Sequence, residues 1–179
     1  LVRSIELGKD GDEAMRTWDW FDRGTGEGGR TAVSAVELRQ HLDDVEREMD
    51  RICRALDLPQ ELQRALILAA RWHDRGKNRD RFQLALGNLR YPEVLLAKAG
   101  GRSARLPETF RHEFASLVDA ANSNELAGES PEFRDIVLHL IAAHHGRARP
   151  HFPTTEIFDP DMTTERSEAF ANDVVSRFG

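Results

Sequence analysis

The stretch 59–76, PQELQRALILAARWHDRG, is a long apolar segment that ends in a histidine and an aspartate. Leu62, Leu66 and Ala69 recur at steps of four and three, which is the period of one face of an α-helix. Apolar residues also occupy much of the other faces of this helix, so we expect it to be central and buried. His73 falls four residues after Ala69 on the same face. The spacing therefore predicts that an imidazole points into the core.

Helical periodicity continues on both sides of this segment. The expected helices cover about 34–56, 59–74, 79–88, 108–121, 130–145 and 163 or 164 to the chain end. Ser34 and Glu37 have the spacing of a capping box, Ser130 is an expected N-cap, and Gly76 and Gly146 are expected to close their helices. No segment of useful length alternates apolar and polar residues, the period of two that indicates a β-strand. The fold class we expect is all-α, a helical bundle with a metal site at its centre.

Residues 1–33 lack a sustained period and contain several glycines. We interpret them as an irregular arm or interdomain connector rather than a phosphate loop, because a phosphate loop needs a preceding strand and TWDWFD is a poor strand. The folded domain is then 34–179. The chain starts without Met and without a signal-peptide pattern, so we expect a domain cut from a longer protein.

Composition narrows the classes of function. The chain has 179 residues, 40% hydrophobic and 31% charged, with 25 Lys and Arg against 31 Asp and Glu, a net charge of −6. A general polyanion binder is excluded, so any nucleic-acid contact must be local or metal-assisted. The single Cys53 allows neither an internal disulfide nor a cysteine-rich zinc site, and a cytoplasmic location is expected. No apolar run approaches the ~20 residues of a membrane span.

Histidines recur on the expected inner faces of other helices. His41 lies three residues after Leu38, and His144, followed by His145, lies three after Ile141. Each alone reads as a core histidine. Their coincidence with a carboxylate beside His73 favours a metal site, because burying an ionised aspartate is costly unless a cation meets it. Imidazole and carboxylate ligands suit Mn, Fe, Co or Ni, with Mg possible, and one carboxylate can bridge two ions.

Basic residues surround the expected ligands. They are Arg75, Lys77, Arg79 and Arg81 near the aspartate, and Arg147 and Arg149 after the second histidine pair. They are either solvated charges or a local site for an anionic substrate, in which Lys77 meets a phosphate oxygen. By periodicity His112 falls opposite the apolar stripe and should be exposed, while His139 and His151 are expected outside the metal site.

Taken together, these motifs resemble the HD-type nuclease domain of the CRISPR-associated helicase-nuclease of type I systems. The resemblance covers roughly residues 35–152 and is carried by His41, HDRGKNRDRFQ at 73–83, RHE at 111–113 and HHGRARPHF at 144–152. It implies that His41, His73 and Asp74 bind one divalent ion, and that Asp74, His112, His144 and His145 bind a second. Lys77 then takes the position near the scissile phosphate.

The resemblance also implies partners and a reaction. Members cut single-stranded DNA, are fed by a helicase domain and are recruited by an RNA-guided surveillance complex. One element departs from the pattern, a late metal-binding aspartate. Asp173 is its nearest counterpart and Asp159 and Asp161 are weaker ones, so we expect the chain to end before that helix. Two alternatives stay open: a nucleotide or cyclic-nucleotide phosphohydrolase of the HD superfamily, and a catalytically silent docking module.

Overall fold

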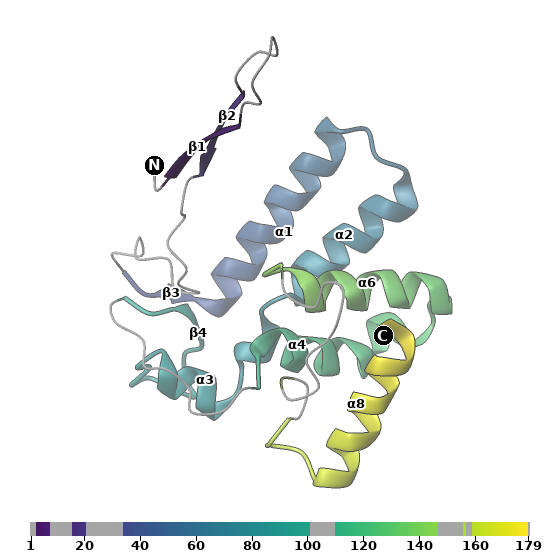
Figure 1. Ribbon diagram of the computed structural model, residues 1–179. Helices are drawn as coiled ribbons and strands as arrows, with labels where there is room; N and C mark the ends of the chain where they lie inside the picture. The colour runs from purple at the N-terminus through teal and green to yellow at the C-terminus, as the bar shows by residue number, and fades with distance from the viewer. Residues whose placement is uncertain are drawn as a thin grey trace.

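The computed structural model describes residues 3–7, 16–20, 34–100, 110–146, 156 and 159–178. Figure 1 shows a bundle of helices of unequal length. The helical elements are α1 (Leu38–Ala55), α2 (Gln60–Trp72), the short 3-10 helix η1 (Arg75–Lys77), α3 (Asp80–Ala85), α4 (His112–Ala121), α5 (Asn124–Ala127), α6 (Pro131–Ala143) and α8 (Thr164–Phe178). The expectation of a helical bundle is confirmed.

Helix α2 buries Ala65, Ala69, Ala70 and Trp72 but leaves Leu62 40% exposed and Leu66 half-buried, so the prediction of a helix buried nearly all round was wrong. The helix packs against α1 on one side and α6 on the other, and α4 packs against α6 and η1 (Figure 1). The main buried core draws its side chains from α2, α3, α4, α5, α6 and α8, whereas Leu38 and Leu42 of α1 form a separate small cluster with Ala97. The largest members of the main core are Trp72, Phe82, Phe110, Phe114, Leu117, Leu126, Phe133, Val137, Leu138, Ile141 and Val174. The ends of α2 and α6 are thereby held against the start of α4.

Short strands accompany the helices. Strand β1 (Arg3–Leu7) pairs with β2 (Arg16–Trp20), and β3 (Val36–Glu37) pairs with β4 (Leu96–Lys98), both antiparallel. The interpretation of 1–33 as irregular, with TWDWFD at 17–22 a poor strand, was wrong for residues 3–7 and 16–20. Trp18 and Trp20 alternate with polar residues, a period-two signal too short to stand out in a single sequence. None of the described helices combines the length and apolar character needed to cross a membrane.

The helix boundaries correct some of the expected caps. Ser130 caps α6 as predicted, with its Oγ accepting from the N–H of Phe133 at 3.2 Å, and Gly146 takes a φ of 73° just past the helix. The capping box at Ser34 was wrong: α1 begins at Leu38 with Glu37 as an N-cap that makes no side-chain bond. The backbone at Glu37 is instead paired with β4.

Gly76 also has a different role from the one expected. Helix α2 ends at Trp72, and Gly76 lies within η1 with a φ outside the left-handed region. A Cβ at this position would overlap the backbone of His112 and Ser116 on α4. The glycine is therefore required by the close approach of two elements and not by a helix cap.

Candidate metal centre

The Asp74 carboxylate lies where α1, α2, α4 and α6 meet. It follows the C-cap of α2, serves as the N-cap residue of η1, and is only 3% exposed. Burial would raise the pKa of this carboxyl, but its contacts with the surrounding histidines, His112 foremost, outweigh burial and lower the pKa well below its usual range. Asp74 is accordingly ionised in the interior of the protein.

The two oxygens of Asp74 face different histidines. Oδ2 lies 3.1 Å from Nε2 of His41 and 3.5 Å from Nε2 of His73. Oδ1 lies 3.1 Å from Nε2 of His112 and 3.7 Å from Nε2 of His144. The carboxylate thus stands between two sets of imidazoles, with one oxygen directed at each.

Two ligand groups result, and they share Asp74. Among the described residues, one consists of His41, His73 and Asp74, and the other of Asp74, His112, His144 and His145. Within each group the potential ligand atoms all lie within 4.8 Å of one another. These are the same two sets that the family resemblance implied from the sequence.

Hydrogen bonds on the far side of the rings set the tautomers of two histidines. Nδ1 of His73 lies 2.7 Å from the carbonyl oxygen of Ala70, and Nδ1 of His144 lies 2.7 Å from that of Ile141. A carbonyl only accepts, so each Nδ1 carries a proton, and in the neutral ring each Nε2 then presents a lone pair to the site. Metal-binding histidines are held in this way by a partner on the other ring nitrogen.

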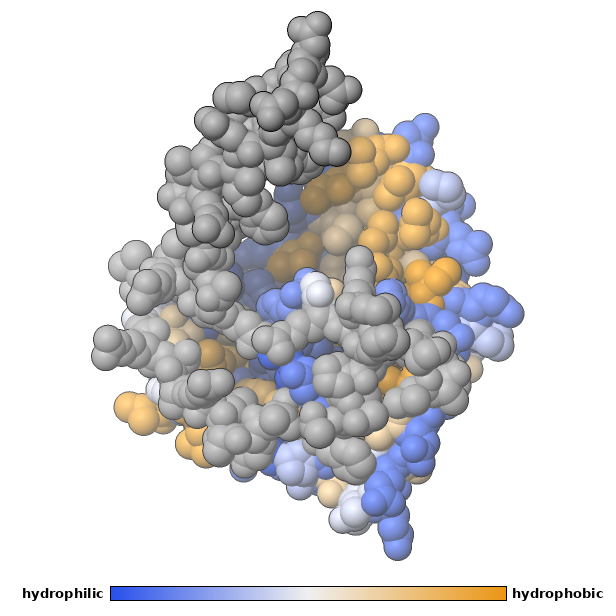
Figure 2. Space-filling model, viewed as in Figure 1, coloured by the Kyte–Doolittle hydropathy of each residue, from blue (hydrophilic) through white to orange (hydrophobic). Residues whose placement is uncertain are grey.

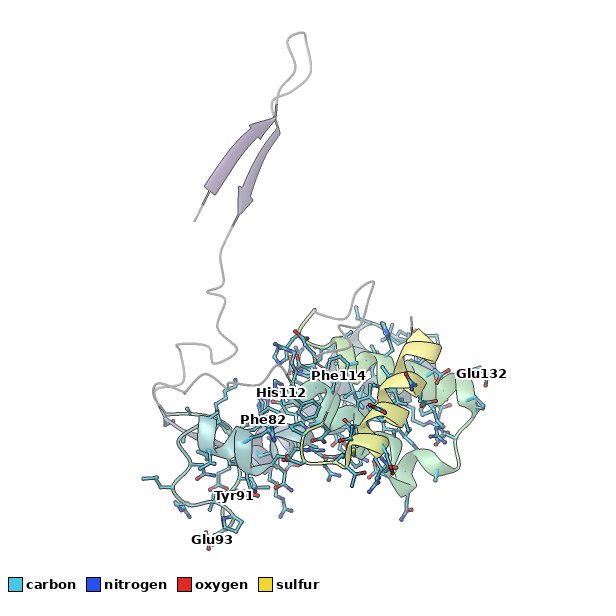
Figure 3. The ribbon with its side chains drawn as sticks, turned by 60° about the horizontal axis from the view of Figure 1, so that its bottom comes forward. Phe82, Tyr91, Glu93, His112, Phe114 and Glu132 are labelled. Atoms are coloured by element: carbon cyan, nitrogen blue, oxygen red, sulfur yellow. The ribbon has the colours of Figure 1, made fainter. Side chains whose placement is uncertain are left out.

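The rings of His112 and His145 have lowered pKa values, which suits them to bind metal. Burial lowers the pKa of His112, and partial desolvation together with the neighbouring rings of His144 and His112 lowers the pKa of His145 to about 4. Both imidazoles are therefore neutral near pH 7. Their Nε2 atoms face each other at 3.1 Å. Figure 3 places His112 in the interior of the bundle beside Phe82 and Phe114.

Unsatisfied atoms at the centre show that these residues fit a cation. Asp74 Oδ1 and His144 Nε2 are buried and make no hydrogen bond to any described residue. Leaving a buried polar group unpaired costs about 1–3 kcal/mol, and more for a charged one. His144 Nε2 and Asp74 Oδ1 lie 3.7 Å apart. An imidazole nitrogen and a carboxylate oxygen are ligands that a divalent ion binds.

Lys77 contributes a positive charge to the centre. Its Nζ donates to Asp74 Oδ2 at 2.8 Å and to the carbonyl oxygen of Ala97 at 3.3 Å. The buried amide of Gln83 holds the surrounding backbone, because it donates to the carbonyls of Lys77 and Leu96 at 2.8 and 2.9 Å. Both the main chain of Lys77 and the strand that receives its ammonium are thereby fixed.

The arginines expected to contact substrate have different surroundings. Arg75 is exposed, with its guanidinium 4.2 Å from the centre of the Trp72 ring. Arg79 is mostly buried and binds Asp119 at 3.0 Å and Asp159 at 3.2 Å, so its charge is met within the fold and its role in DNA binding stays a prediction. Arg81 is paired with Asp161 at 2.9 Å. Arg147 and Arg149 lie outside the described residues.

The proposed late aspartates do not join the centre. Asp159 is buried against Arg79, Asp161 pairs with Arg81, and Asp173 is exposed on α8. Within the part of the chain that the structure describes, neither ligand group includes any of the three. His139 lies on α6 in neither group, and His151 is outside the described residues.

Periodicity was wrong about His112, and it missed Glu113. His112 is 6% exposed because the first turn of α4 is enclosed by α2, α3 and the end of α6 rather than lying on a surface helix. Glu113, 1% exposed, falls three residues after Phe110 and four before Leu117. A carboxylate in phase with an apolar stripe is a signal that the sequence did contain.

The comparison with protein families agrees with this geometry. The family model described as "Cas3, HD domain" matches residues 30–176. The chain belongs to the Cas3 HD-domain family. Membership identifies it as an HD-type metal-dependent phosphohydrolase or nuclease domain of CRISPR systems. No curated protein and no solved structure matches the chain significantly.

Figure 2 shows how hydrophobic and hydrophilic side chains are distributed over one face of the Cas3 HD domain. Apolar side chains gather over the upper part of the face shown, at the end of α1 and the start of α2, where Ile52, Leu56 and Leu62 are exposed. Hydrophilic side chains gather nearer the middle of the same face (Figure 2). Among the basic residues of 34–100, Arg75 is the closest in sequence to Asp74, and Arg71 and Lys77 each lie three residues from it.

Proposed function

We propose that this Cas3 HD domain is a nuclease that hydrolyses phosphodiester bonds of single-stranded DNA in CRISPR interference. It works with a helicase, in the same chain or separate, and with an RNA-guided surveillance complex. The observation that supports this proposal is that the two oxygens of Asp74 face two histidine groups. A carboxylate shared by ions about 3.5–4 Å apart is the arrangement used for in-line attack on phosphodiesters.

The ligands follow from the two groups. His41, His73 and Asp74 would hold one divalent ion, and Asp74, His112, His144 and His145 the other. Mg, Mn, Ni, Co and Fe all suit imidazole and carboxylate ligands to different degrees. When bound, such ions supply positive charge to the phosphate and activate water for attack. The protein holds the ligands on separate helices, so the geometry is set by packing.

Basic side chains complete the proposal. The side chain of Lys77 is 13% exposed and its ammonium contacts Asp74, which supports a role in donating to a non-bridging phosphate oxygen. Arg75 is exposed one residue from Asp74 and stacks on Trp72, and we expect the other face and the N–H groups of its guanidinium to meet a base or a phosphate. Arg147 and Arg149 stay proposed DNA contacts from the sequence. We also infer a cytoplasmic location, for which the CRISPR context is the support.

The decisive experiment is cleavage of a labelled single-stranded DNA by this domain, with Mn²⁺ and with a chelator. The variant is Asp74→Asn, which keeps the size of the side chain and removes its charge, and the control is His139→Gln on α6. Bound metal is counted in all three proteins. We expect cleavage that needs Mn²⁺, is lost in Asp74→Asn together with the metal, and is retained in His139→Gln.

Other outcomes distinguish the alternatives. Cleavage by Asp74→Asn at the unmodified rate would refute the role of the shared carboxylate. Hydrolysis of nucleotides or cyclic nucleotides in the same assay, without DNA cleavage, would favour the phosphohydrolase. A protein that binds neither metal nor substrate would favour the docking module.

A further inference from the structure

A histidine that binds metal through Nε2 needs a hydrogen-bond acceptor at Nδ1, which places the proton on the far side of the ring. His73 and His144 obtain that acceptor from their own helices. Each is the C-cap residue of its helix, α2 or α6, and each Nδ1 donates to the carbonyl three residues earlier. Carbonyls in the last turn of a helix have no intrahelical partner and are free to accept.

His112 is placed differently and has no such carbonyl. It is the first residue of α4, and the preceding Arg111 is extended, with φ −111° and ψ 147°. No turn of helix lies before the ring. The acidic group nearest its Nδ1 is the carboxylate of Glu113, whose Oε2 lies 3.4 Å away.

The surroundings of Glu113 leave one oxygen for His112. Oε1 accepts from Arg111 Nε at 3.0 Å and from Arg111 Nη2 at 2.6 Å. Oε2 is buried and makes no hydrogen bond to any described residue. The carboxylate lies in the first turn of α4, where the helix dipole favours a negative charge. A shift of about half an ångström brings Oε2 to an ordinary N–H···O distance from Nδ1.

The tautomer of His112 decides whether it can bind metal. Nε2 lies 3.1 Å from Asp74 Oδ1. With the proton on Nε2, the ring donates to Asp74 and offers no lone pair to an ion. With the proton on Nδ1, the ring donates to a carboxylate on its other side and Nε2 is a ligand. The neighbour of Nδ1 therefore controls the site.

We propose that Glu113 is a positioning residue that accepts the Nδ1 proton of His112 and so turns the Nε2 lone pair of that ring toward the ion shared by Asp74, His144 and His145. Arg111 holds the other carboxylate oxygen and keeps Glu113 turned toward the ring. The inference rests on the proposed metal site and assigns it a further residue.

Glu113→Gln is the informative variant, because it keeps shape while changing the hydrogen-bond capacity. Arg111 donates to Oε1, so it selects the amide oxygen at that position and directs the NH₂ group at His112. An amide NH₂ only donates, which forces Nδ1 to accept and moves the proton to Nε2. We expect Mn²⁺ affinity for the second ion to fall about 10–100-fold, measured by calorimetry, since this is the usual effect of removing such a partner.

The matched control is Glu156→Gln. Glu156 is a second carboxylate near Arg111, with Oε2 3.8 Å from Arg111 Nε. The same change there should leave Mn²⁺ affinity unaltered. Thermal unfolding of both variants separates a local effect from loss of the fold.

A measurement on the unmodified, metal-free protein tests the same point without mutation. Long-range ¹⁵N–¹H correlation spectra distinguish the tautomers, and the signals lost in His112→Gln identify the ring. Nδ1–H on His112 supports the proposal, and Nε2–H overturns it, as does unchanged Mn²⁺ affinity in Glu113→Gln. If the unmodified protein binds no Mn²⁺, the metal site itself fails, while the spectrum still decides the contact between Glu113 and His112.

Discussion

The backbone N–H of Gly76 donates to Ser116 Oγ at 2.8 Å, deep in the interface between η1 and α4. The bond lies two residues after Asp74 and one helical turn after His112. It therefore holds together the two elements that carry the facing halves of the metal centre. No room for a side chain remains at Gly76, because a Cβ would overlap α4.

We expect Gly76→Ala to destabilise the domain and weaken the metal site together. The clash is with backbone atoms of α4, which cannot rotate away, so η1 must move from α4. Overpacking of this kind costs about 1–3 kcal/mol or more, measured as the free energy of unfolding in urea. The control is Gly128→Ala, since a Cβ at Gly128 meets no atom within 4 Å. Equal stability of the two variants would contradict the proposed contact.

Arg79 should prove important for stability rather than for substrate. It pairs with Asp119 and with Asp159, which is 2% exposed and would be left as an uncompensated buried charge in Arg79→Met. Removing one partner of a buried ion pair costs about 3–5 kcal/mol, although the exposure of Asp119 moderates its share. Urea unfolding measures this loss. An unfolding free energy equal to that of the unmodified protein would show that the pair does not stabilise the fold.

Arg75→Ala should weaken DNA binding and leave stability nearly unchanged, the reverse of what we expect for Arg79→Met. The guanidinium is exposed and stacked on Trp72, where such contacts contribute about 0.5–1 kcal/mol, so stability should change little. Affinity for single-stranded DNA should fall. The slope of log affinity against log salt concentration should become shallower by about 1, which corresponds to one lost phosphate contact. Fluorescence anisotropy at several salt concentrations measures both. Unchanged affinity and slope would remove Arg75 from the proposed DNA-binding residues.

Lys77→Ala should lower the turnover number for DNA cleavage while metal stays bound, because the lysine is expected at the phosphate. Gln83→Met should lower it too, by about 10-fold, since it frees the backbone of Lys77 and of Leu96. A double-mutant cycle tests the link: once Lys77 is alanine, Gln83→Met should affect turnover little. Fully additive effects would show that Gln83 acts independently of Lys77. Ser130→Ala, which removes the N-cap of α6, controls for a general loss of stability.

Much of this domain could be predicted from the residues alone. Apolar periodicity located α1, α2, α4, α6 and α8 to within a few residues, because an amphipathic helix must repeat with the period of its own backbone. The histidines that fell in phase with those stripes, His41, His73 and His144, are mostly buried, with side chains 15%, 13% and 17% exposed, and their rings face Asp74. Adjacent His73 and Asp74 on a buried helix predicted a cation, since an isolated buried carboxylate is too costly.

Other features depended on which elements meet in three dimensions. His112 is buried because α4 is enclosed on several sides, which a wheel of one helix does not show. Arg79 lies among basic residues in the sequence, yet Asp119 and Asp159 come from distant segments to bind it. Gly76 must lack a side chain because α4 packs against it, and Glu113 is buried because other elements cover it. Periodicity shows which face of a single helix is buried. It does not show which residues of other segments contact that face, because packing in three dimensions decides those contacts.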